Sequence, residues 1–285
     1  MTLFDERMFP YTKTFKKEML PIVDVDGRTK PSILVIIEEA LRAGIEEIGL
    51  IVRSSDIPMF RNFFESALPP DLHSKLSASD REYAEYLNSV GKRITYLIQD
   101  TQEGLGHAVY CAEPFVRSEP FLLLLGDHLF HTHQQESCAS QVVTVFERTN
   151  VSVVGVTHGR EEELRLYGVV TGKWDEESQS VLAITEFAEK PTVEYAKEHL
   201  RMGGSDSYHL LFGIYVLKAD IFTYLEENIR NDFREKGEYQ LTSCLDKMRE
   251  KDGFKGVLVK GMRYDIGVPH AYRDTVTLFG REKDS

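Results

Sequence analysis

The sequence predicts an α/β fold in which a mainly parallel mixed sheet is flanked by helices. The first observation is the alternation of helical and strand-like patterns up to Thr157, which favours parallel strands joined by helical crossovers. The second is the stretch 93–127, which contains a β-rich run, a glycine-rich turn, a helix and an apolar strand, and ends on a carboxylate. The third is a series of short β runs after residue 160, which predicts a smaller β-rich extension.

The first half of the chain supplies the elements of the predicted parallel sheet. Residues 31–43 have helical spacing, with an apolar face that includes Ile33, Ile36 and Ile37. In chain order, the further elements are a strand at 47–52, a helical excursion at 56–90, a strand at 93–99, a helix that opens at 104–108, a strand at 121–125, a helix near 141–147 and a strand at 151–157.

The second half of the chain supplies the predicted extension. The β runs 167–170 and 181–187 are separated by the polar turn 173–180, which indicates a hairpin. We expect one domain over residues 1–285, with halves 1–158 and 159–285 and the substrate cleft between them. The remaining elements are helices near 193–200, 221–228 and 241–250, strands at 210–217 and 255–260, and a C-terminal helix from His270.

Size and charge limit the classes of function. With 285 residues, of which 42% are hydrophobic and 28% charged, the chain can bury the core of one large domain. A net charge of −12 argues against a nucleic-acid partner, because binding to a phosphate backbone requires clustered Lys and Arg. Bound phosphates would therefore depend on a few placed cations and a metal ion.

Cysteine usage and hydropathy predict a cytoplasmic protein with no membrane partner. Cys111, Cys138 and Cys244 have no CxxC spacing and are too few for a disulfide framework. No segment approaches the ~18 apolar residues of a membrane span, and the N-terminus lacks a basic start followed by an apolar signal core.

Two polar residues follow predicted strands directly. Gln99 ends the strand at 93–99, and Asp127 follows the strand at 121–125. Ligands of open α/β sheets bind beyond the carboxyl ends of the strands. We therefore expect Gln99 and Asp127 at the ligand-binding edge.

Eight motifs carry a family resemblance. They occur in the order found in sugar-1-phosphate nucleotidylyltransferases, and the chain is most similar to the bacterial-type UTP–glucose-1-phosphate uridylyltransferases (UDP-glucose pyrophosphorylases). Together they extend over nearly the whole chain. In order, they are Thr12-Lys13 with Lys17-Glu18-Met19-Leu20-Pro21-Ile22, Lys30-Pro31, Gly104-Leu105-Gly106-His107-Ala108, Gly126-Asp127, Tyr167-Gly168-Val169-Val170, Glu189-Lys190-Pro191, Gln240-Leu241-Thr242 and Tyr264-Asp265-Ile266-Gly267.

This resemblance implies a Rossmann-like nucleotidyltransferase fold with a nucleotide-binding half at 1–158 and a sugar-binding half at 159–285. It also implies the Mg²⁺-dependent transfer of a uridylyl group from UTP to glucose 1-phosphate, which yields UDP-glucose and pyrophosphate. In such a transfer the protein mainly positions the reactants and neutralises charge. Homo-oligomers are common in the family, so a homo-oligomer is a further expectation.

The resemblance also assigns the charged groups. Asp127 and Asp265 match the Mg²⁺ ligands of the family, and carboxylates suit that ion. Lys17 would face the triphosphate and Lys190 the sugar phosphate, as point charges for phosphate oxygens. The alternative readings are that Asp127 caps a loop, that Asp265 makes a turn and that Lys17 is a solvated surface charge.

The remaining assignments concern the sugar and the base. Glu189 would accept hydrogen bonds from sugar hydroxyls, and Gly168 and Gly213 would let the backbone approach the ring. Gln99 and Gly104 would read the base, because an amide offers a donor and an acceptor to a pyrimidine edge. The alternative for the glycines is a turn or a strand bulge, which for Gly213 by itself is the preferred reading.

The start of the chain departs from the family pattern. Family members begin with a hydrophobic strand and a Gly-x-Gly-Thr-Arg loop whose N–H groups bind the triphosphate. This chain starts Met1-Thr2-Leu3-Phe4-Asp5-Glu6-Arg7, so the strand is absent and only Arg7 of the loop remains, as a catalytic candidate. Acidic Asp5 and Glu6 would repel phosphates. The missing strand would leave a central position of the sheet empty or an edge exposed.

Three hypotheses follow. The first is a UTP–glucose-1-phosphate uridylyltransferase, either complete with an altered start or cut from a longer chain. The second is a catalytically impaired sugar-nucleotide-binding or regulatory homologue that lacks the phosphate loop. The third is a thymidylyltransferase, or an enzyme for another sugar, of the same family.

Overall fold

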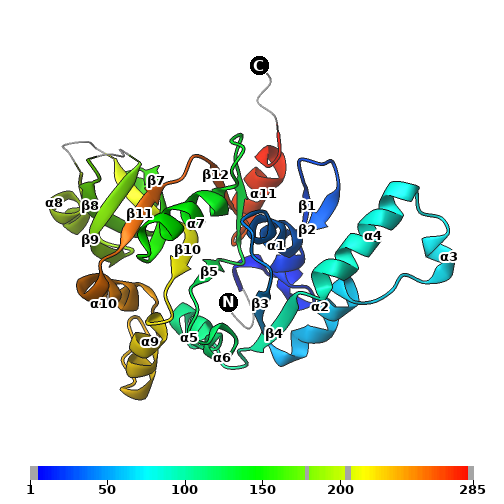
Figure 1. The fold of residues 1–285 in the computed structure, drawn as a ribbon, viewed down its shortest axis with the longest axis horizontal. Coiled ribbons are helices and arrows are strands. Elements are labelled where there is room, and N and C mark those ends of the chain that lie inside the picture. Colours follow the sequence, from blue (N-terminus) through cyan, green and yellow to red (C-terminus); the bar gives the residue numbers. More distant parts are fainter. Residues whose placement is uncertain (1–5, 177–179, 203–206, 282–285) are drawn as a thin grey trace.

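A computed structural model describes residues 6–176, 180–202 and 207–281, and within these ranges strands form one six-stranded and three two-stranded sheets. Helices flank these sheets (Figure 1). The strands are β1 (Pro21–Val23), β2 (Thr29–Pro31), β3 (Ile48–Val52), β4 (Ile94–Ile98), β5 (Phe121–Leu124), β6 (His128–His131), β7 (Val153–Gly159), β8 (Gly168–Trp174), β9 (Val181–Glu189), β10 (Tyr208–Leu217), β11 (Lys255–Leu258) and β12 (Met262–Asp265).

The predicted helices lie within a few residues of those in the structure, and the helical excursion at 56–90 forms three helices. Side chains cap several N-termini, as when Ser137 Oγ accepts from the Ser140 amide before α7. In chain order, the helices are α1 (Ser32–Arg42), α2 (Ile57–Phe64), α3 (Pro70–His73), α4 (Ala78–Gly91), α5 (Leu105–Tyr110), α6 (Glu113–Val116), α7 (Cys138–Thr149), α8 (Val193–His199), α9 (Ile221–Arg230), α10 (Thr242–Asp252) and α11 (Pro269–Leu278).

The main sheet has the strand order β5-β10-β7-β11-β9-β8. The expected mixed α/β fold is confirmed, but the pairing corrects the expectation of a mainly parallel sheet. Only β7 and β11 run parallel among the described pairs of this sheet. The reason is that β10, a strand of the second half, lies antiparallel between β5 and β7 of the first half. One sheet therefore contains strands from both halves, and the predicted hairpin β8–β9 continues it.

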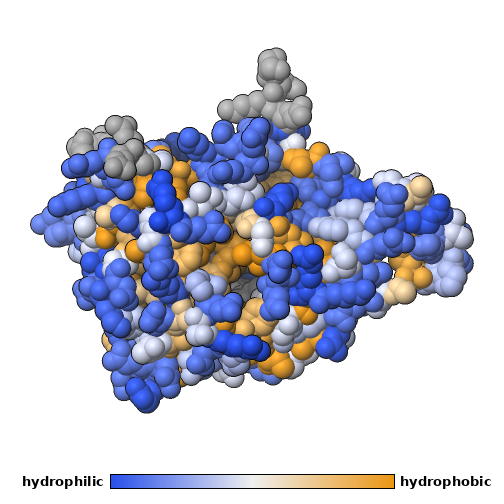
Figure 2. Space-filling view, in the orientation of Figure 1, coloured by the Kyte–Doolittle hydropathy of each residue, from blue (hydrophilic) through white to orange (hydrophobic). Residues whose placement is uncertain are grey.

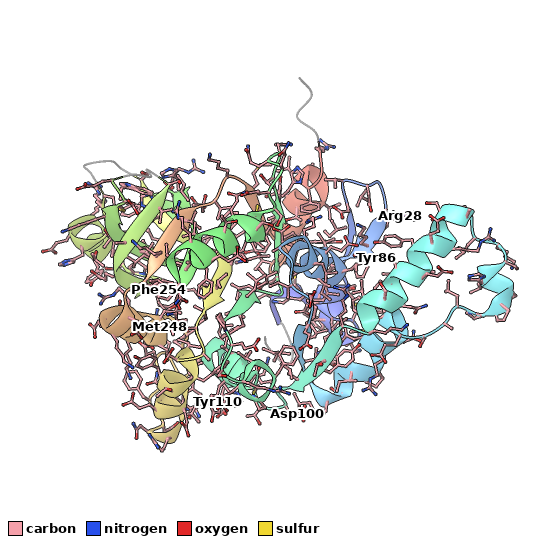
Figure 3. The ribbon with its side chains drawn as sticks, viewed as in Figure 1. Arg28, Tyr86, Asp100, Tyr110, Met248 and Phe254 are labelled. Carbon is pink, nitrogen blue, oxygen red and sulfur yellow. The ribbon has the colours of Figure 1, made fainter. Side chains whose placement is uncertain are left out.

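Both faces of the main sheet are covered by helices, which buries all ten residues of β10. Val142 of α7 packs in a cluster with Val153 and Ile214, whereas Val154 packs with residues of α9 and α10. Neighbouring residues of β7 thus face opposite clusters, as the pleat of a strand requires. Met248 of α10 and the nearby Phe254 belong to the same hydrophobic cluster as Val154 (Figure 3). Of the predicted hairpin turn, residues 177–179 lie outside the described part.

The strands β3 and β4 form a separate parallel pair with the register Ile48↔Ile94. The hydrophobic cluster that packs against this pair includes Ile37 of α1, Phe60 of α2 and Val90 of α4. No described strand joins this pair to β5 of the main sheet. This separation leaves a cavity between the two sheets, which is considered below.

Residues 21–31 form the hairpin β1–β2, and its turn lies against α4. The Arg28 guanidinium lies over the Tyr83 ring, 4.4 Å from the centroid, and donates to Asp80 Oδ1 at 2.7 Å. Figure 3 shows Arg28 beside the helix that carries Tyr86. Residues 23–29, which include this turn, thus contact α4 of the helical excursion.

The strands β6 and β12 pair antiparallel with Asp265 opposite His128. Neither of these four-residue strands was predicted from the sequence. This pair brings the segment after β5 to the segment at the end of β12. Within the described ranges, no helix combines the length and the apolarity that a membrane span requires.

Candidate active site

Two carboxylates converge on Gly267. Asp127 follows β5, and its carbonyl oxygen accepts a hydrogen bond from the Ile266 amide at 3.0 Å. Asp265 ends β12, and its Oδ1 accepts from the Gly267 amide. A Cβ added to Gly267 would lie 3.0 Å from Asp265 Oδ1 and 3.2 Å from Asp127 Oδ2. The structure therefore brings together the two aspartates that the family resemblance implies as metal ligands.

Two cations adjoin these carboxylates. Lys17 Nζ lies 3.0 Å from Asp127 Oδ2, and the side chain of Lys17 is only 5% exposed. Lys17 is thus a buried, paired cation and not a solvated surface charge. Arg7 Nη1 lies 3.8 Å from the same point at Gly267. Burial opposes ionisation of Asp127, but Lys17, His128 and Arg7 outweigh it and hold the pKa of Asp127 well below its usual value.

Glu18 is a further carboxyl group beside this cluster, and the sequence analysis gave it no role. Its side chain is buried, and among the described residues its Oε1 has no hydrogen-bond partner. Burial raises the pKa of Glu18 to about 7, although the neighbouring Lys17 lowers it. Only its position in the Lys17-Glu18 motif could have drawn attention to it.

His128 and Gly213 occupy adjoining positions next to Asp127. His128 is buried, burial lowers its pKa, and its Nδ1 has no hydrogen-bond partner in the part of the chain described. A Cβ on Gly213 would clash with that Nδ1. Gly213 has φ +93° and lies where the register of β10 against β7 shifts. Gly213 therefore lies at an irregularity of β10, and His128 explains why the position has no room for a side chain.

A second group of predicted residues lies where β8 begins and β9 ends. Gly168 pairs with Glu189 in the hairpin register, and a Cβ on Gly168 would lie 3.3 Å from Glu189 Oε2. That oxygen accepts a hydrogen bond from Thr242 Oγ1 at 2.7 Å. Lys190 Nζ lies 3.7 Å from Glu189 Oε1, and the Lys190 side chain is 48% exposed. The carboxylate is thus fixed while the ammonium faces solvent.

Aromatic and cationic side chains connect the two groups. The Arg263 guanidinium lies over the Tyr167 ring, 3.7 Å from the centroid, and it also opposes protonation of His128. Burial and the charge of Glu189 raise the pKa of Tyr215, whereas Arg263 lowers it. The Tyr167 ring precedes Gly168 in the chain and lies 6.3 Å from the His128 ring between centroids, so Arg263 stacks on a residue that lies between the two groups. No site role was predicted from the sequence for Arg263, Tyr215 or Thr242.

Gln99 and Gly104 form a third group. The Gln99 side chain is buried, and its Nε2 lies 3.4 Å from the Gly104 oxygen and 3.1 Å from His107 Nδ1. Gly104 has φ +105°, and a Cβ there would lie 2.7 Å from the Tyr239 oxygen. The turn thus requires glycine for conformation and for space. The carbonyl oxygen of Gly104 lies within hydrogen-bond distance of the Gln99 side-chain amide, the group that was predicted to read the base.

One cavity of about 1330 Å³ connects the first and third groups, because Arg7, Lys17, Gly104 and Asp127 all line it. Carboxylate oxygens are the protein ligands that Mg²⁺ prefers, and this ion commonly binds one or two carboxylates together with substrate phosphates. The pair Asp127 and Asp265 fits that donor set. The neighbouring cations fit the phosphates of a nucleotide or of a sugar phosphate.

Comparison with known proteins identifies relatives over almost the whole chain. Residues 5–279 match the family described as nucleotidyl transferase. The chain is 32% identical to UTP–glucose-1-phosphate uridylyltransferase 1 of Staphylococcus saprophyticus subsp. saprophyticus, over 98% of this chain and 90% of that protein. It is 34% identical to the UTP–glucose-1-phosphate uridylyltransferase of Bacillus subtilis, over 97% of this chain and 87% of the other.

Solved structures of UDP-glucose pyrophosphorylases are also similar to this chain. The fold is similar to that of an apo UDP-glucose pyrophosphorylase, with a TM-score of 0.81 and 28% identity over 96% of this chain and 93% of that one. A UDP-glucose pyrophosphorylase complexed with UDP-glucose matches with a TM-score of 0.79 and 28% identity, over 96% and 94% of the two chains.

Proposed function

The chain belongs to the nucleotidyl transferase family, and from that premise we propose that it transfers the uridylyl group of UTP to glucose 1-phosphate. The family and the fold expected from the sequence are both confirmed. The observation that carries the proposal is the convergence of Asp127 and Asp265 on Gly267, beside the cations Lys17 and Arg7. The names of the relatives support the substrates.

In the proposed reaction, a phosphate oxygen of glucose 1-phosphate forms a bond to the α-phosphorus of UTP. The bond from that phosphorus to the bridging oxygen breaks, and its electrons leave with pyrophosphate. Negative charge develops on the phosphate oxygens, so fixed cations close to them lower the barrier. Lys17 and Arg7 supply such charges on the nucleotide side. Because Lys17 is buried and held by Asp127, its position is set before the substrate binds.

Asp127 and Asp265 would hold Mg²⁺, which would neutralise phosphate charge when it is bound. The support is the donor set, since both carboxylates face the same point. The low pKa of Asp127 keeps that carboxylate ionised at neutral pH.

Glucose 1-phosphate would bind at the hairpin end of the sheet. Glu189 is oriented by Thr242 and keeps a second oxygen for a sugar hydroxyl. Lys190 follows Glu189 with an exposed ammonium, which suits the sugar phosphate. Gly168 adds no side chain next to Glu189, but the Leu211 side chain already occupies the space that a Cβ at this position would take. Gln99 and Gly104 would receive the uracil at the opposite end of the site.

The catalytically impaired homologue is a second candidate, and one observation favours it. Lys17, the cation proposed for the triphosphate, already neutralises Asp127. A protein of this kind would bind UDP-glucose through the Glu189 group without turnover.

Release of pyrophosphate tests the proposal. The purified chain is incubated with UTP, glucose 1-phosphate and Mg²⁺, and the controls omit the sugar phosphate or add EDTA. We expect release only in the complete mixture, and faster release with UTP than with dTTP. Calorimetric binding of UDP-glucose without any pyrophosphate release would support the impaired homologue. Equal or faster release with dTTP would support the thymidylyltransferase.

A further inference from the structure

Two histidines stand directly opposite each other on neighbouring strands of the main sheet. His158 of β7 and His209 of β10 are partners in the antiparallel register, so their side chains lie on the same face of the sheet. The centroids of the two imidazole rings are 5.1 Å apart. Neither histidine lines the cavity described above. Figure 2 shows a hollow near the middle of the molecule, whereas β7 and β8 lie toward its left side (Figure 1).

His209 is a buried polar side chain without hydrogen-bond partners. It is only 3% exposed, and among the described residues neither its Nδ1 nor its Nε2 forms a hydrogen bond. Buried polar groups are hydrogen-bonded in the great majority of cases, because an unmade hydrogen bond in the interior destabilises the fold. An apolar side chain at position 209 would avoid this cost. The imidazole therefore indicates a ligand for one of its nitrogens.

The surroundings of His209 keep its ring neutral. The Trp174 ring packs against it edge to face, with 5.2 Å between the centroids. Burial, and next the neighbouring His158, lower the pKa of His209 to about 4. A neutral imidazole has one nitrogen with a free lone pair, which is the form that binds a metal ion. At pH 7, His209 thus offers a buried nitrogen ligand.

The separation of the two rings fits one shared metal ion. Zn–N bonds to imidazole are about 2.0–2.1 Å long, and two rings bound at a tetrahedral angle have centroids roughly 5 Å apart. His158 is exposed, and the terminal torsion of a histidine is broad, so its ring can turn a nitrogen toward an ion bound by His209. Within the described ranges, no group of three or more His, Cys, Asp and Glu side chains could hold a metal ion. Water from the exposed side would therefore complete the coordination.

We propose that His158 and His209 together bind one divalent transition-metal ion of the kind that prefers nitrogen ligands, Zn²⁺ or Cu²⁺. Imidazole suits these ions, whereas Mg²⁺ and Ca²⁺ prefer oxygen ligands. The site is therefore chemically different from the pair Asp127 and Asp265. The ion links β7 to β10 and gives one nitrogen of His209 the partner that it lacks. The inference does not depend on the proposed reaction.

A purely structural role explains the pair less well. Two aromatic rings opposite each other on neighbouring strands stabilise a sheet by roughly 0.2–1 kcal/mol. A phenylalanine at position 209 would supply the same packing without burying two polar nitrogens. If the pair only packs, the protein binds no transition-metal ion at these residues, and the following experiment shows it.

The test uses the fluorescence of Trp174, which is the single tryptophan of the chain and contacts the His209 ring. Metal-free protein is titrated with Cu²⁺, which quenches a nearby indole. Excess Mg²⁺ is present throughout, so that sites with oxygen ligands are occupied. We expect saturable quenching with one ion per chain, and an electron paramagnetic resonance spectrum of the bound Cu²⁺ with couplings to two nitrogens.

A variant of the exposed ligand provides the second test. His158→Gln leaves the buried ring in place, and it should weaken the binding of Cu²⁺ at least about tenfold and remove one of the two nitrogen couplings. His73→Gln, at an exposed position of α3, is the matched control and should bind like the parent. Absence of quenching, or equal quenching in His158→Gln and the parent, overturns the proposal. So does a spectrum of the parent with couplings to fewer than two nitrogens, because the ion would then be bound elsewhere.

Discussion

Lys17 Nζ lies 3.0 Å from Asp127 Oδ2, and this ion pair joins the short helical turn Lys17–Met19 to the segment after β5. The side chain of Lys17 is almost fully buried, so the carboxylate is its necessary counter-ion. Asp127 consequently has two roles, since it stabilises a buried ammonium and is also the proposed ligand for Mg²⁺. Asp265 instead accepts from the Gly267 amide, so substituting the two aspartates one at a time separates these roles.

Asp127→Asn and Asp265→Asn should each lower the Mg²⁺-dependent turnover by at least about 100-fold, because each removes one ligand charge with little change in volume. Only Asp127→Asn should also reduce the free energy of unfolding, by about 1–3 kcal/mol, because Lys17 then loses this ion pair. Pyrophosphate release and urea denaturation measure the two effects. Asp71→Asn, on exposed α3, is the matched control. Activity retained in both site variants would contradict the metal assignment.

Glu18→Gln should change how stability depends on pH. The pKa of Glu18 is raised from 4.5 to about 7 in the folded protein, so the folded state holds the proton more tightly than the unfolded state does. The contribution of Glu18 to stability is therefore highest below about pH 4.5, falls as the pH rises to about 7, and is constant above that. The total loss is about 3 kcal/mol. Glu18→Gln should remove this decline, because the amide does not titrate.

Urea denaturation at pH 5, 6, 7 and 8 provides the measurement for Glu18. The difference in unfolding free energy between Glu18→Gln and the parent should grow with pH across this interval and stop growing above about pH 7. Glu162→Gln, at an exposed position, should follow the parent curve. Parallel curves for Glu18→Gln and the parent would mean that this carboxyl group keeps an ordinary pKa.

Lys190→Ala should raise the KM for glucose 1-phosphate about tenfold, the effect of losing one charge-assisted contact of about 1.4 kcal/mol. The KM for UTP should change less than about twofold, because Lys190 follows Glu189 at the end of β9 and is not among the residues that line the cavity with Gly104. Steady-state kinetics with each substrate varied in turn provide the comparison. Lys197→Ala, on α8, removes an exposed lysine of the same hairpin end and is the control. Equal changes in both KM values would argue against a sugar-phosphate role for Lys190.

The sequence predicted most of the elements, because hydrophobic periodicity records which face of a helix or strand is buried. The strand direction was harder to predict. β10 follows the hairpin in the sequence but is placed between β5 and β7, and no local pattern indicates which neighbours a strand will pair with. The four-residue strands β6 and β12 also lack a recognisable period, although they bring Asp127 and Asp265 together.

Of the candidate site, the sequence predicted the residue types that carry chemistry but not those that orient them. Asp127 and Lys17 stand in recognisable motifs, and the structure makes them partners. Thr242 and Arg263 act on residues far away in the sequence, Glu189 and Tyr167, so only the fold reveals these contacts. The separation of β3 from β5 was the reverse case. The resemblance to the family implied either an empty central position of the sheet or an exposed edge, and the structure contains a cavity lined by β3 and β5.

Gly213→Ala should destabilise the protein by about 2–4 kcal/mol, because the new methyl group meets His128 Nδ1 and the backbone is held at φ +93°. Gly237→Ala isolates the backbone contribution, since Gly237 has φ +85° and a Cβ added there would meet no atom within 4 Å. Gly237→Ala should lower the free energy of unfolding by only about 1 kcal/mol. Combining Gly213→Ala with His128→Ala removes the steric contact, so the double variant should be more stable than the sum of the single effects predicts, by about 1 kcal/mol or more. Urea denaturation of the parent, Gly213→Ala, His128→Ala and the double variant measures this coupling. Strict additivity would show that His128 does not restrict position 213, and that the conformation of the bulge alone requires glycine.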